Sequence, residues 1–396
     1  MLAQPPLSLY IHIPWCVKKC PYCDFNSHEF GAHAALPQKE YIAALCADFD
    51  LDYALARGSA AQRPIHSIFI GGGTPSLFDA SAFDTLLQHI ARSQAPGWLT
   101  SPSLEITLEA NPGTLEAGRF AEFRAAGINR LSLGIQSFDD AQLTRLGRIH
   151  DAAQARRAIA SARDAGFTNF NLDLMHGLPD QTLEQALDDL RSALEFEPPH
   201  LSWYQLTIEP NTVFYSKPPP LPTESILASV QDVGHTLLAS HGFAQYEVSA
   251  YARSTNAQSR HNLNYWQFGD YLGIGAGAHG KITLEGKDQP QRTRKQRQPD
   301  HYLKAAVSET RGMLVESKPI PQDEIALEYL LNILRTRQGF TPAHFECHTG
   351  LSFSVIAKRV ESLRSKGLLG AEANDGRITT TDRGFKYLNN VLEEFI

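Results

Sequence analysis

Short β-rich runs alternate with Ala- and Leu-rich helical segments through the first two-thirds of this 396-residue chain. Strands are expected at 8–13, 67–73, 104–110, 130–137, 169–177 and 200–208. Between them, a 3.6-residue apolar period predicts helices at 38–57, 79–92, 115–125, 152–165 and 181–195. This strand–helix–strand rhythm predicts a parallel sheet with right-handed crossovers, either open or closed into a barrel.

Three successive strands of this series each have one polar face. Residues 104–110 divide into two sets, Leu104, Ile106 and Leu108 on one face and Glu105, Thr107 and Glu109 on the other. A parallel strand covered on both faces should be apolar throughout, so the pattern favours a barrel with polar groups around an inner ligand cavity. Near the carboxyl ends of their strands, where barrel enzymes place their sites, lie Glu109, Gln136 and Asp173. The alternative is a set of inward polar groups that satisfy one another without a ligand.

Beyond about residue 253 the rhythm stops. We expect a loop-rich region at 254–300, in which the basic run "RTRKQR" at 292–297 is a solvated loop. Residues 301–396 are mostly helical, and the order helix, helix, short strand, helix predicts a winged-helix-like module. The expected fold is therefore an α/β barrel at 1–253, a loop region at 254–300 and this C-terminal module at 301–396.

Composition excludes several classes of protein. The net charge of −7 gives no basic footprint, and no basic helix suits a groove, so no nucleic-acid partner is expected. No uncharged apolar stretch approaches the roughly 20 residues that span a bilayer, and the N-terminus lacks the basic start of a signal peptide. Five cysteines, odd in number and clustered, indicate reduced thiols in the cytoplasm rather than a disulfide framework.

Three cysteines fall within eight residues, as Cys16-x3-Cys20-x2-Cys23, directly after the first expected strand. Structural zinc usually takes four ligands in two separated pairs, and the two remaining cysteines have no such spacing. His12 is a possible fourth ligand, but from its strand it would need a tight reversal of the chain. A [4Fe–4S] cluster accepts three cysteines and leaves one iron open, so the spacing favours a cluster over zinc or inert thiols.

This cysteine spacing resembles the radical S-adenosylmethionine (SAM) superfamily, in which the open iron chelates SAM. "GGGTP" at 71–75, after the second strand, resembles that superfamily's glycine motif. Together with "LEANPGT", "RLSLGIQSF", "NLDLMHGLP" and "HNLNYW", these segments resemble the oxygen-independent coproporphyrinogen dehydrogenase group, in particular its HemW-type haem chaperones. The resemblance spans nearly the whole chain and implies a radical-SAM partial (β/α)6 barrel with a C-terminal domain.

The resemblance also implies a set of SAM-binding residues. Tyr10 and the backbone at Tyr22 would contact the cluster-bound SAM, and a second SAM would lie at the three residues Gln136, Arg148 and Asp173. The full set is Tyr10, Tyr22, Gly72, Gly73, Thr74, Glu109, Gln136, Arg148 and Asp173. For Arg148 the residue type alone leaves a surface ion pair equally open.

Two features separate the chaperones from the dehydrogenases. The dehydrogenase motif continues with one more cysteine, where this chain has Asp24 and Phe25. "HNLNYW" at 261–266 resembles the HNxxYW signature of haem binding, which implies haem contacts from His261, Asn262, Tyr265 and Trp266. From the residues alone, a loop whose aromatics plug the barrel mouth and whose histidine is hydrogen-bonded is favoured, and it is the resemblance that reverses this preference.

Three other histidines are expected to have structural roles. His12, His176 and His279 lie near strand ends or glycine turns. "YLGIGAGAHG" at 271–280 lacks the following helix and acidic residue of a dinucleotide loop, which excludes a Rossmann site. Its glycines are expected to bring the backbone close to the SAM adenosine or the haem.

The resemblance implies a cytoplasmic haem chaperone with a [4Fe–4S] cluster and SAM, which delivers haem to recipient haemoproteins such as membrane respiratory enzymes. Cluster and SAM would support loading, a monomer–dimer change or transfer. The alternative is an oxygen-independent coproporphyrinogen III dehydrogenase, which removes propionate carboxyl groups by radical chemistry. A third reading is a radical-SAM enzyme for an unrelated substrate.

Overall fold

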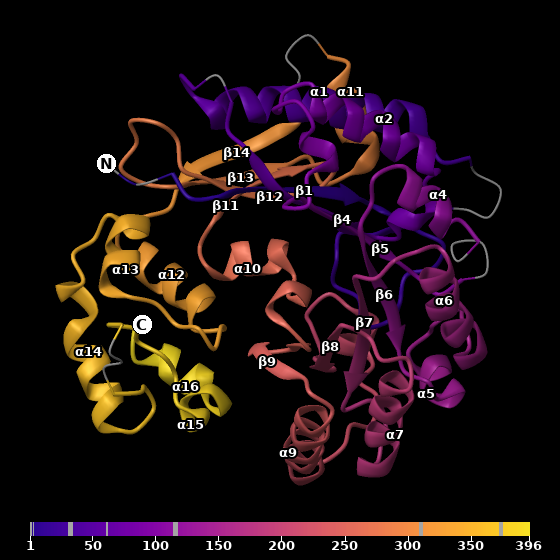
Figure 1. The fold of residues 1–396 in the computed structure, drawn as a ribbon, viewed down its shortest axis with the longest axis vertical. Coiled ribbons are helices and arrows are strands. Elements are labelled where there is room, and N and C mark those ends of the chain that lie inside the picture. Colours follow the sequence, from indigo (N-terminus) through magenta and orange to yellow (C-terminus); the bar gives the residue numbers. More distant parts are fainter. Residues whose placement is uncertain are drawn as a thin grey trace.

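The computed structural model describes residues 2, 4–30, 35–60, 62–113, 118–308, 312–371 and 375–396. Within these residues one curved sheet has twelve strands in the order β14-β13-β12-β11-β1-β4-β5-β6-β7-β8-β10-β9 (Figure 1). Its six expected strands are confirmed as β1 (Leu7–Ile13), β4 (Ile65–Gly72), β5 (Glu105–Ala110), β6 (Arg130–Gln136), β7 (Phe170–His176) and β8 (His200–Gln205). They pair in parallel in that order, so their carboxyl ends meet along one edge.

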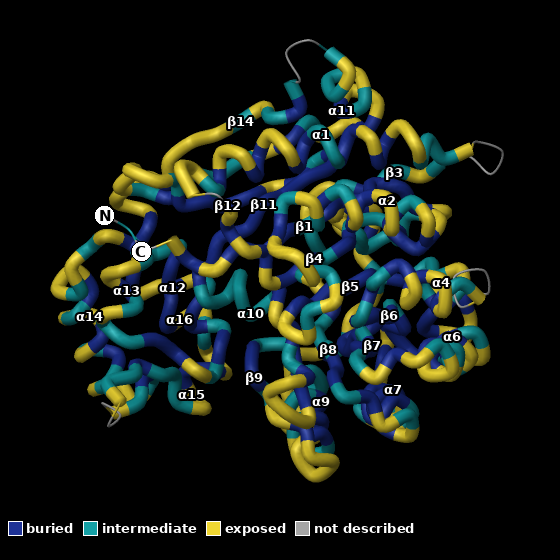
Figure 2. The backbone as a smooth tube through the Cα atoms, turned by 45° about the horizontal axis from the view of Figure 1, so that its top comes forward, coloured by how far each residue is buried: buried dark blue, intermediate teal, exposed yellow. Residues whose placement is uncertain are grey.

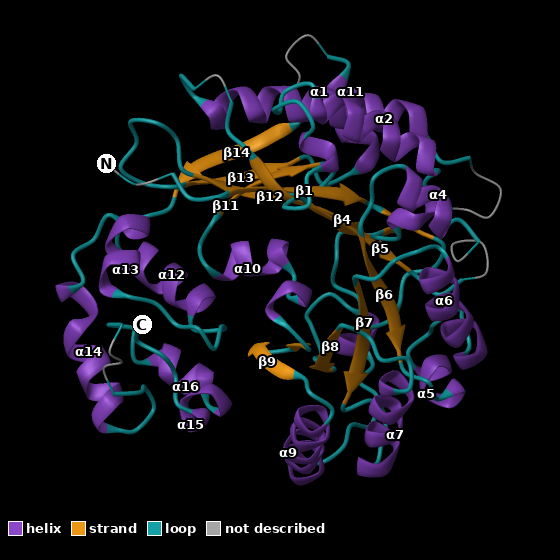
Figure 3. Cartoon of the chain, viewed as in Figure 1, coloured by secondary structure: helices purple, strands orange, loops and turns teal. Residues whose placement is uncertain are grey.

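Helices cover the outer face of these strands (Figure 3). They are α1 (Gln38–Arg57), α2 (Ala80–Ala91), α4 (Phe120–Ala125), α5 (Asp140–Arg145), α6 (Ala152–Asp164), α7 (Leu183–Leu194) and α9 (Glu224–Ser240). Short elements between them are α8 (Val213–Ser216), η1 (Pro75–Leu77), η2 (Trp98–Thr100) and η3 (Thr255–Ala257). Of the helix expected at 115–125, residues 115–117 lie outside the described residues. Capping boxes begin α6 and α7, where Asp151 and Thr182 each accept a hydrogen bond from the amide three residues on.

The apolar strand faces form the main core against these helices (Figure 2). Leu131, Leu133 and Ile135, the apolar face of β6, are fully buried. Truncating one of them to alanine would cost about 2–5 kcal/mol, through lost burial and the cavity left behind. The opposite, polar face points to the inside of the curve, as the alternation predicts.

The expectation of a loop-rich region at 254–300 is wrong. It contains α10 (Arg260–Trp266), β11 (Asp270–Ile274), β12 (His279–Ile282) and β13 (Gln291–Lys295). β11 pairs in parallel with β1, and β12 and β13 follow in antiparallel order. Seven neighbouring strands are therefore parallel, because β11 adds to the six predicted ones.

The basic run at 292–297 is also not a solvated loop, since residues 292–295 belong to β13. Lys295 is 1% exposed, and its ammonium donates to the carboxylates of Asp48 and Asp52 on α1. From the sequence alone a lysine indicates solvent, but here it is paired inside the protein.

The sheet continues beyond residue 300, with β14 (Leu314–Pro319) at one edge, and α11 (Pro299–Ala306) packs on α1. At the other edge lie β10 (Ala250–Ala252) and β9 (Ala244–Glu247). A two-stranded sheet of β2 (Trp15–Cys16) and β3 (His28–Glu29) brackets the cysteine loop.

The C-terminal helical unit therefore begins near residue 320, rather than at 301. It comprises α12 (Ile325–Ile333), α13 (Pro342–Thr349), α14 (Ser354–Ser365), α15 (Asp382–Lys386) and α16 (Leu388–Glu393), with its own apolar core. Two isolated bridges, Phe340–Ile378 and Leu369–Thr380, form the short β element of the expected winged-helix-like order. The unit lies on the inner side of the sheet's curve, together with α10 (Figure 1).

This unit contacts both ends of the sheet. At β9, the Val248 amide donates to the Arg335 carbonyl at 3.1 Å and the Arg337 amide donates to the Tyr246 carbonyl at 3.0 Å. At β13, Arg292 pairs with Glu328 of α12. Among the described helices, none has both the length and the apolar character that crossing a membrane requires.

Candidate functional site

A cavity of about 480 Å³ opens at the carboxyl ends of the parallel strands, beside the cysteine loop. Most of the predicted site residues line it, and they come from segments that are far apart in the sequence. They are Cys16, Cys20, Tyr22, Cys23, Gly72, Gly73, Thr74, Glu109, Gln136, Arg148, Asp173, Asn262 and Trp266. Tyr10, His261 and Tyr265 are the predicted residues that do not line it.

The cysteine loop is held at both of its ends. Cys16 belongs to β2, which pairs in parallel with β3, so the chain returns to its starting point after the loop. Inside the loop, the Cys23 amide donates to the Cys20 carbonyl at 3.1 Å. The Arg148 guanidinium lies 3.5 Å from the Cys20 sulfur. The loop therefore presents three thiols to one cavity with little freedom.

The donor set fits an iron–sulfur cluster better than a single metal ion. Across the described ranges, no three His, Cys, Asp or Glu side chains converge as ligands of one ion. The thiols instead border a common space, as the separate irons of a cluster require. Burial raises the pKa of the Cys16 and Cys23 thiols, so a cationic centre is needed to hold them as thiolates.

His12 is not free to act as a fourth ligand. Its Nε2 donates to the Asn26 carbonyl at 2.9 Å, and its Nδ1 accepts from the Tyr10 hydroxyl at 3.0 Å. Burial lowers the pKa of His12 to about 4, so the ring is neutral. The predicted structural role of His12 is confirmed, and Tyr10 contacts this histidine rather than the cavity.

The glycine motif provides close backbone packing behind the cysteine loop. A Cβ on Gly73 would lie 2.5 Å from the Trp15 carbonyl oxygen, and one on Gly72, whose φ is +113°, would meet the His12 ring at 2.6 Å. The Gly73 and Thr74 amides donate to the carbonyls of Ile13 and Trp15, each at 2.7 Å. Only glycine lets β4 end this close to the cysteine loop.

Two half-buried carboxyl groups, those of Glu109 and Asp173, face the cavity. Burial, reinforced by the nearby Asp173, raises the pKa of Glu109 to about 7. Burial also raises the pKa of Asp173, although Ser132 and Asn171 donate to it at 2.9 Å and 2.8 Å. The Gly72 amide donates to Glu109 at 3.1 Å. This pair is suited to a ligand with positive charge, and SAM carries an ammonium and a sulfonium.

Arg148 supplies the opposite charge in the same cavity, beside the cysteine loop. Its guanidinium donates to Asn111 Oδ1 at 2.6 Å and to the Gly134 carbonyl at 3.1 Å. No carboxylate in the described part of the chain pairs with it, and its buried Nε finds no partner there. The surface ion pair that the residue type left open is therefore not observed, and Arg148 is available to a carboxylate of a ligand.

Gln136 is held in a backbone conformation that non-glycine residues rarely adopt, with φ of +68° at the end of β6. Its side-chain oxygen accepts from the Tyr204 hydroxyl at 2.9 Å. Tyr204, Asn111 and Ser202 also line the cavity, and sequence reasoning missed them. Ser202 and Tyr204 alternate in β8, so the period-2 argument used for three strands would have found these two.

The HNLNYW segment is a helix, and its two faces separate the four predicted haem residues. Asn262 and Trp266, four residues apart, line the cavity. His261 and Tyr265 face the barrel interior, where their rings lie 4.9 Å apart. His261 is 1% exposed, its Nδ1 lies 3.2 Å from Ser67 Oγ, and burial lowers its pKa to about 3.

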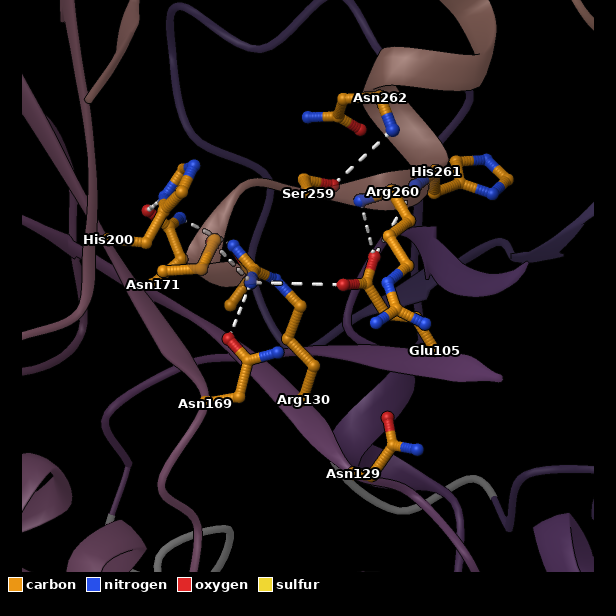
Figure 4. Close-up of polar contacts among 12 residues, drawn as sticks. Glu105, Asn129, Arg130, Asn169, Asn171, His200, Ser259, Arg260, His261 and Asn262 are labelled. Atoms are coloured by element: carbon orange, nitrogen blue, oxygen red, sulfur yellow. Dashed lines mark hydrogen bonds and ion pairs between the residues drawn. The ribbon is translucent and has the colours of Figure 1, made fainter. Parts of the chain in front are cut away.

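The N-terminus of α10 is anchored from below (Figure 4). Glu105 accepts from the Arg260 and His261 amides at 2.8 Å and 3.3 Å, as suits a carboxylate at a helix start. Arg130, 2% exposed, lies 3.9 Å from Glu105 and donates to Asn169 at 2.6 Å. This buried network fixes the helix that brings Asn262 and Trp266 to the cavity.

The remaining histidine and glycine predictions concern packing. His176 is buried, with its ring 4.4 Å from that of Trp203, and His279 begins β12. In the 271–280 segment, a Cβ on Gly273 would meet the His279 carbonyl at 1.9 Å, so this glycine serves strand packing. The described cavity lining contains no residue of 271–280, so an approach of these glycines to a cofactor stays a prediction.

Comparison with known proteins places the chain. A model of the radical SAM superfamily matches residues 10–193. The chain is 48% identical over 392 residues to a Haemophilus influenzae protein named heme chaperone HemW, covering 99% of this chain and 98% of that one. It is also 48% identical over 398 residues to the Escherichia coli heme chaperone HemW, covering 100% of both chains. The chain belongs to the HemW family.

A HemW-family fold agrees with the solved structure of E. coli coproporphyrinogen III oxidase (HemN), a radical SAM enzyme. The TM-score is 0.79 at 22% identity, over 99% of this chain and 90% of that one. The predicted α/β radical-SAM fold with a C-terminal helical domain is therefore confirmed. Membership of the radical SAM superfamily implies a [4Fe–4S] cluster and SAM, which the cysteine loop and the acid pair fit.

Proposed function

We propose that this HemW-family protein is a haem chaperone, which binds haem and delivers it to recipient haemoproteins. The observation that carries the proposal is the shared cavity, in which the cysteine loop and two residues of the HNxxYW helix line the same space. Relatives named heme chaperone HemW at 48% identity over the full length support it. Membrane respiratory enzymes as recipients, a cytoplasmic location and a monomer–dimer change remain parts of the proposal.

Within this function, each group of cavity residues has a task. Cys16, Cys20 and Cys23 hold the cluster, which supplies one-electron chemistry when bound. Glu109 and Asp173 attract the positively charged groups of SAM, and Arg148 receives a carboxylate. Three residues, Gly72, Gly73 and Thr74, keep the end of β4 against the cysteine loop. Glu109 and Asp173 therefore stay close to that loop.

For haem, Trp266 is the residue best placed for contact. Its flat ring borders the cavity, and Asn262 lies on the same face of α10. His261 points to the other side, so its Nε2, which has no partner among the described residues, reaches haem only if α10 rotates or shifts. Ligation by His261 is therefore the part of the proposal that demands movement.

The alternative is a coproporphyrinogen III dehydrogenase, and Phe25 argues against it. Phe25 lines the cavity and is 59% exposed at the place where the dehydrogenase motif has a further cysteine. A phenyl ring offers neither a thiol nor a proton to a reacting substrate. The three cluster cysteines and the acid pair do not discriminate between the two functions.

The test is an anaerobic haem titration of the cluster-reconstituted protein, followed in the Soret region. Trp266→Ala should weaken binding about tenfold or more, as expected for loss of a buried aromatic contact. Phe69→Leu is the matched control, because Phe69 packs on His261 at 5.2 Å without lining the cavity. His261→Ala in parallel decides whether the helix moves to give a ligand. Absence of saturable binding by wild type, with turnover of coproporphyrinogen III, would replace the proposal by its alternative.

A further inference from the structure

A chain of buried hydrogen bonds runs from Asp173 in the cavity to the start of α10. Asn171 Nδ2 donates to Asp173 Oδ1 at 2.8 Å, and Asn171 Oδ1 lies 2.7 Å from His200 Nδ1. His200 Nε2 lies 2.7 Å from the Tyr246 hydroxyl oxygen, which also accepts from the Ser259 amide at 3.2 Å. Figure 4 shows Asn171 and His200 to the left of Arg130 and Glu105. This relay of hydrogen bonds, formed by Asn171, His200, Tyr246 and Ser259, thus joins the candidate ligand-binding carboxylate to the N-cap of the HNxxYW helix.

The donor and the acceptor in each hydrogen bond of this relay can be assigned. The Asn171 oxygen is an acceptor, so His200 donates from Nδ1 and its Nε2 accepts from the Tyr246 hydroxyl. Burial, followed by the charge of Arg130, lowers the pKa of His200 well below its ordinary value, which keeps the ring neutral. A neutral imidazole has one N–H only, so the arrangement on one side of the ring determines the other.

These links are direct hydrogen bonds between buried residues. The four relay residues Asn171, His200, Tyr246 and Ser259 are between 1% and 6% exposed. Each donor faces an acceptor, so no member changes its arrangement without its neighbour changing too. Ser202 is the side branch, donating to Asn171 Oδ1 at 3.1 Å from the cavity wall.

A second network reaches the same helix without touching the cavity. At the amino-terminal end of β5, Glu105 accepts from the α10 amides. Arg130 lies beside Glu105, and neither residue lines the cavity. If the relay served only to anchor α10, it would duplicate this anchor. Its other end instead lies at Asp173, whose carboxylate already accepts from Asn171 and Ser132.

We propose that His200 and Tyr246 are positioning residues that couple SAM binding at Asp173 to the placement of α10 and hence to haem binding. The inference rests on the proposed function, because it takes α10 as the haem-contacting helix. A ligand that engages Asp173 competes with the Asn171 amide. Withdrawal of that amide also moves its oxygen away from His200 Nδ1, so the ring and the Tyr246 hydroxyl that donates to it shift together, and with them the acceptor of the Ser259 amide.

Such a relay has two arrangements, with the Asn171 amide bound to Asp173 or displaced from it, as coupling between separate sites requires. Coupling is reciprocal, so haem must change the affinity for SAM by the same factor. Allosteric couplings typically amount to a factor of about 5 to 150. For this relay we expect a SAM-dependent change in haem affinity of about tenfold.

The test uses the full-length, cluster-reconstituted protein without oxygen. Haem is titrated with and without saturating SAM, and SAM is titrated with and without haem. In Tyr246→Phe, which loses only the hydroxyl, the factor should fall from about tenfold toward one, while each ligand alone still binds. Tyr251→Phe is the matched control, because Tyr251 is 2% exposed on neighbouring β10 and its hydroxyl contacts Gln245 rather than the relay. Tyr251→Phe should keep the wild-type factor.

A second readout does not depend on haem. Hydrogen exchange of the α10 amides should change when SAM is added to wild type, and it should not respond to SAM in Tyr246→Phe. An unchanged coupling factor in Tyr246→Phe, or α10 exchange in wild type that ignores SAM, overturns the inference. If the wild-type protein does not bind haem but its α10 exchange responds to SAM, the proposed function is wrong and the relay still holds. If Tyr246→Phe does not fold, the wild-type exchange experiment still decides.

Discussion

Two pairs of acids in this protein, one buried and one half-buried at the cavity, differ in the presence of a cation. Asp48 and Asp52 on α1 share the Lys295 ammonium from β13, and Tyr302 donates to Asp48 at 2.7 Å. Glu109 and Asp173 have hydrogen-bond donors but no Lys or Arg in ion-pair contact within the described residues. A buried charge without a partner is costly, so it persists where something else supplies the opposite charge. The first pair stabilises the fold, and the second is a candidate site for a cation.

The pKa values of the two pairs express the same difference. Burial alone would lower the pKa of Lys295, but Asp48 and Asp52 outweigh it and raise that pKa. Burial raises the pKa of Asp52 to about 6, against the lowering effect of Lys295. For Glu109, burial and the Asp173 charge act in the same direction, and its pKa reaches about 7. The comparison teaches that a charge imbalance inside the protein, rather than burial itself, marks the ligand site.

The largest expected effect comes from removing the cation of the balanced pair. Lys295→Met leaves two buried carboxyl groups without their partner and should destabilise the protein by about 3–5 kcal/mol. Urea unfolding measures the loss. Lys318→Met is the control, since Lys318 is 70% exposed in a surface pair with Glu316, and it should change stability by less than about 0.5 kcal/mol. Equal losses in the two variants would contradict the balance argument.

An intermediate effect is expected from the unbalanced pair, and it depends on pH. The pKa of Glu109 is raised from 4.5 to about 7, so ionisation disfavours the ligand-free folded state. Stability should fall as the pH rises from about 4.5 to about 7, by about 3 kcal/mol in total, and Glu109→Gln should remove this decline. The difference between the unfolding free energies of variant and wild type at pH 5 and pH 8 isolates Glu109 from other titrating groups. The exposed control Glu122→Gln in α4 should retain the wild-type slope, and a Glu109→Gln slope equal to wild type would refute the assignment.

The smallest effect should come from Asp52→Asn. Lys295 keeps the Asp48 carboxylate, and one positive and one negative charge then remain, so the loss should be about 1 kcal/mol or less by urea unfolding. A loss as large as that of Lys295→Met would mean that the hydrogen bond to Asp52, rather than charge balance, stabilises this cluster. Together, the unfolding free energies of the three variants show whether charge balance or burial has the larger effect on stability.

Much of the fold and of the site was predictable because the signals were local. Strands β1 and β4 to β8 follow from runs of β-branched and apolar residues, and the cysteine loop follows from its spacing. Glu109, Gln136 and Asp173 were found by strand alternation alone, and the structure brings all three to one cavity. A period-2 pattern fixes which face a side chain takes, and parallel strands bring their carboxyl ends together.

What could not be predicted depends on distant contacts. β13 contains Lys295, which indicates solvent locally, and only its pairing with Asp48 and Asp52 on α1 explains its burial. α10 has seven residues, too few for a helical period to be recognised, so the separation of His261 from Trp266 was hidden. The relay through His200 and Tyr246 joins residues 46 positions apart, and no local pattern announces such a contact.

The parallel pairing of β1 with β11 has a consequence for synthesis of the chain. β1 ends at Ile13 and its partner begins at Asp270, so a ribosome adds more than half of the protein between them. At about 5–20 residues per second this takes on the order of tens of seconds, during which β1 can pair only with β4. The nascent protein therefore carries an unpaired strand edge directly before its cysteine loop until the HNxxYW helix and β11 have left the ribosome. Closure of that edge and completion of the cavity wall by Trp266 therefore occur together, late in the synthesis of the protein.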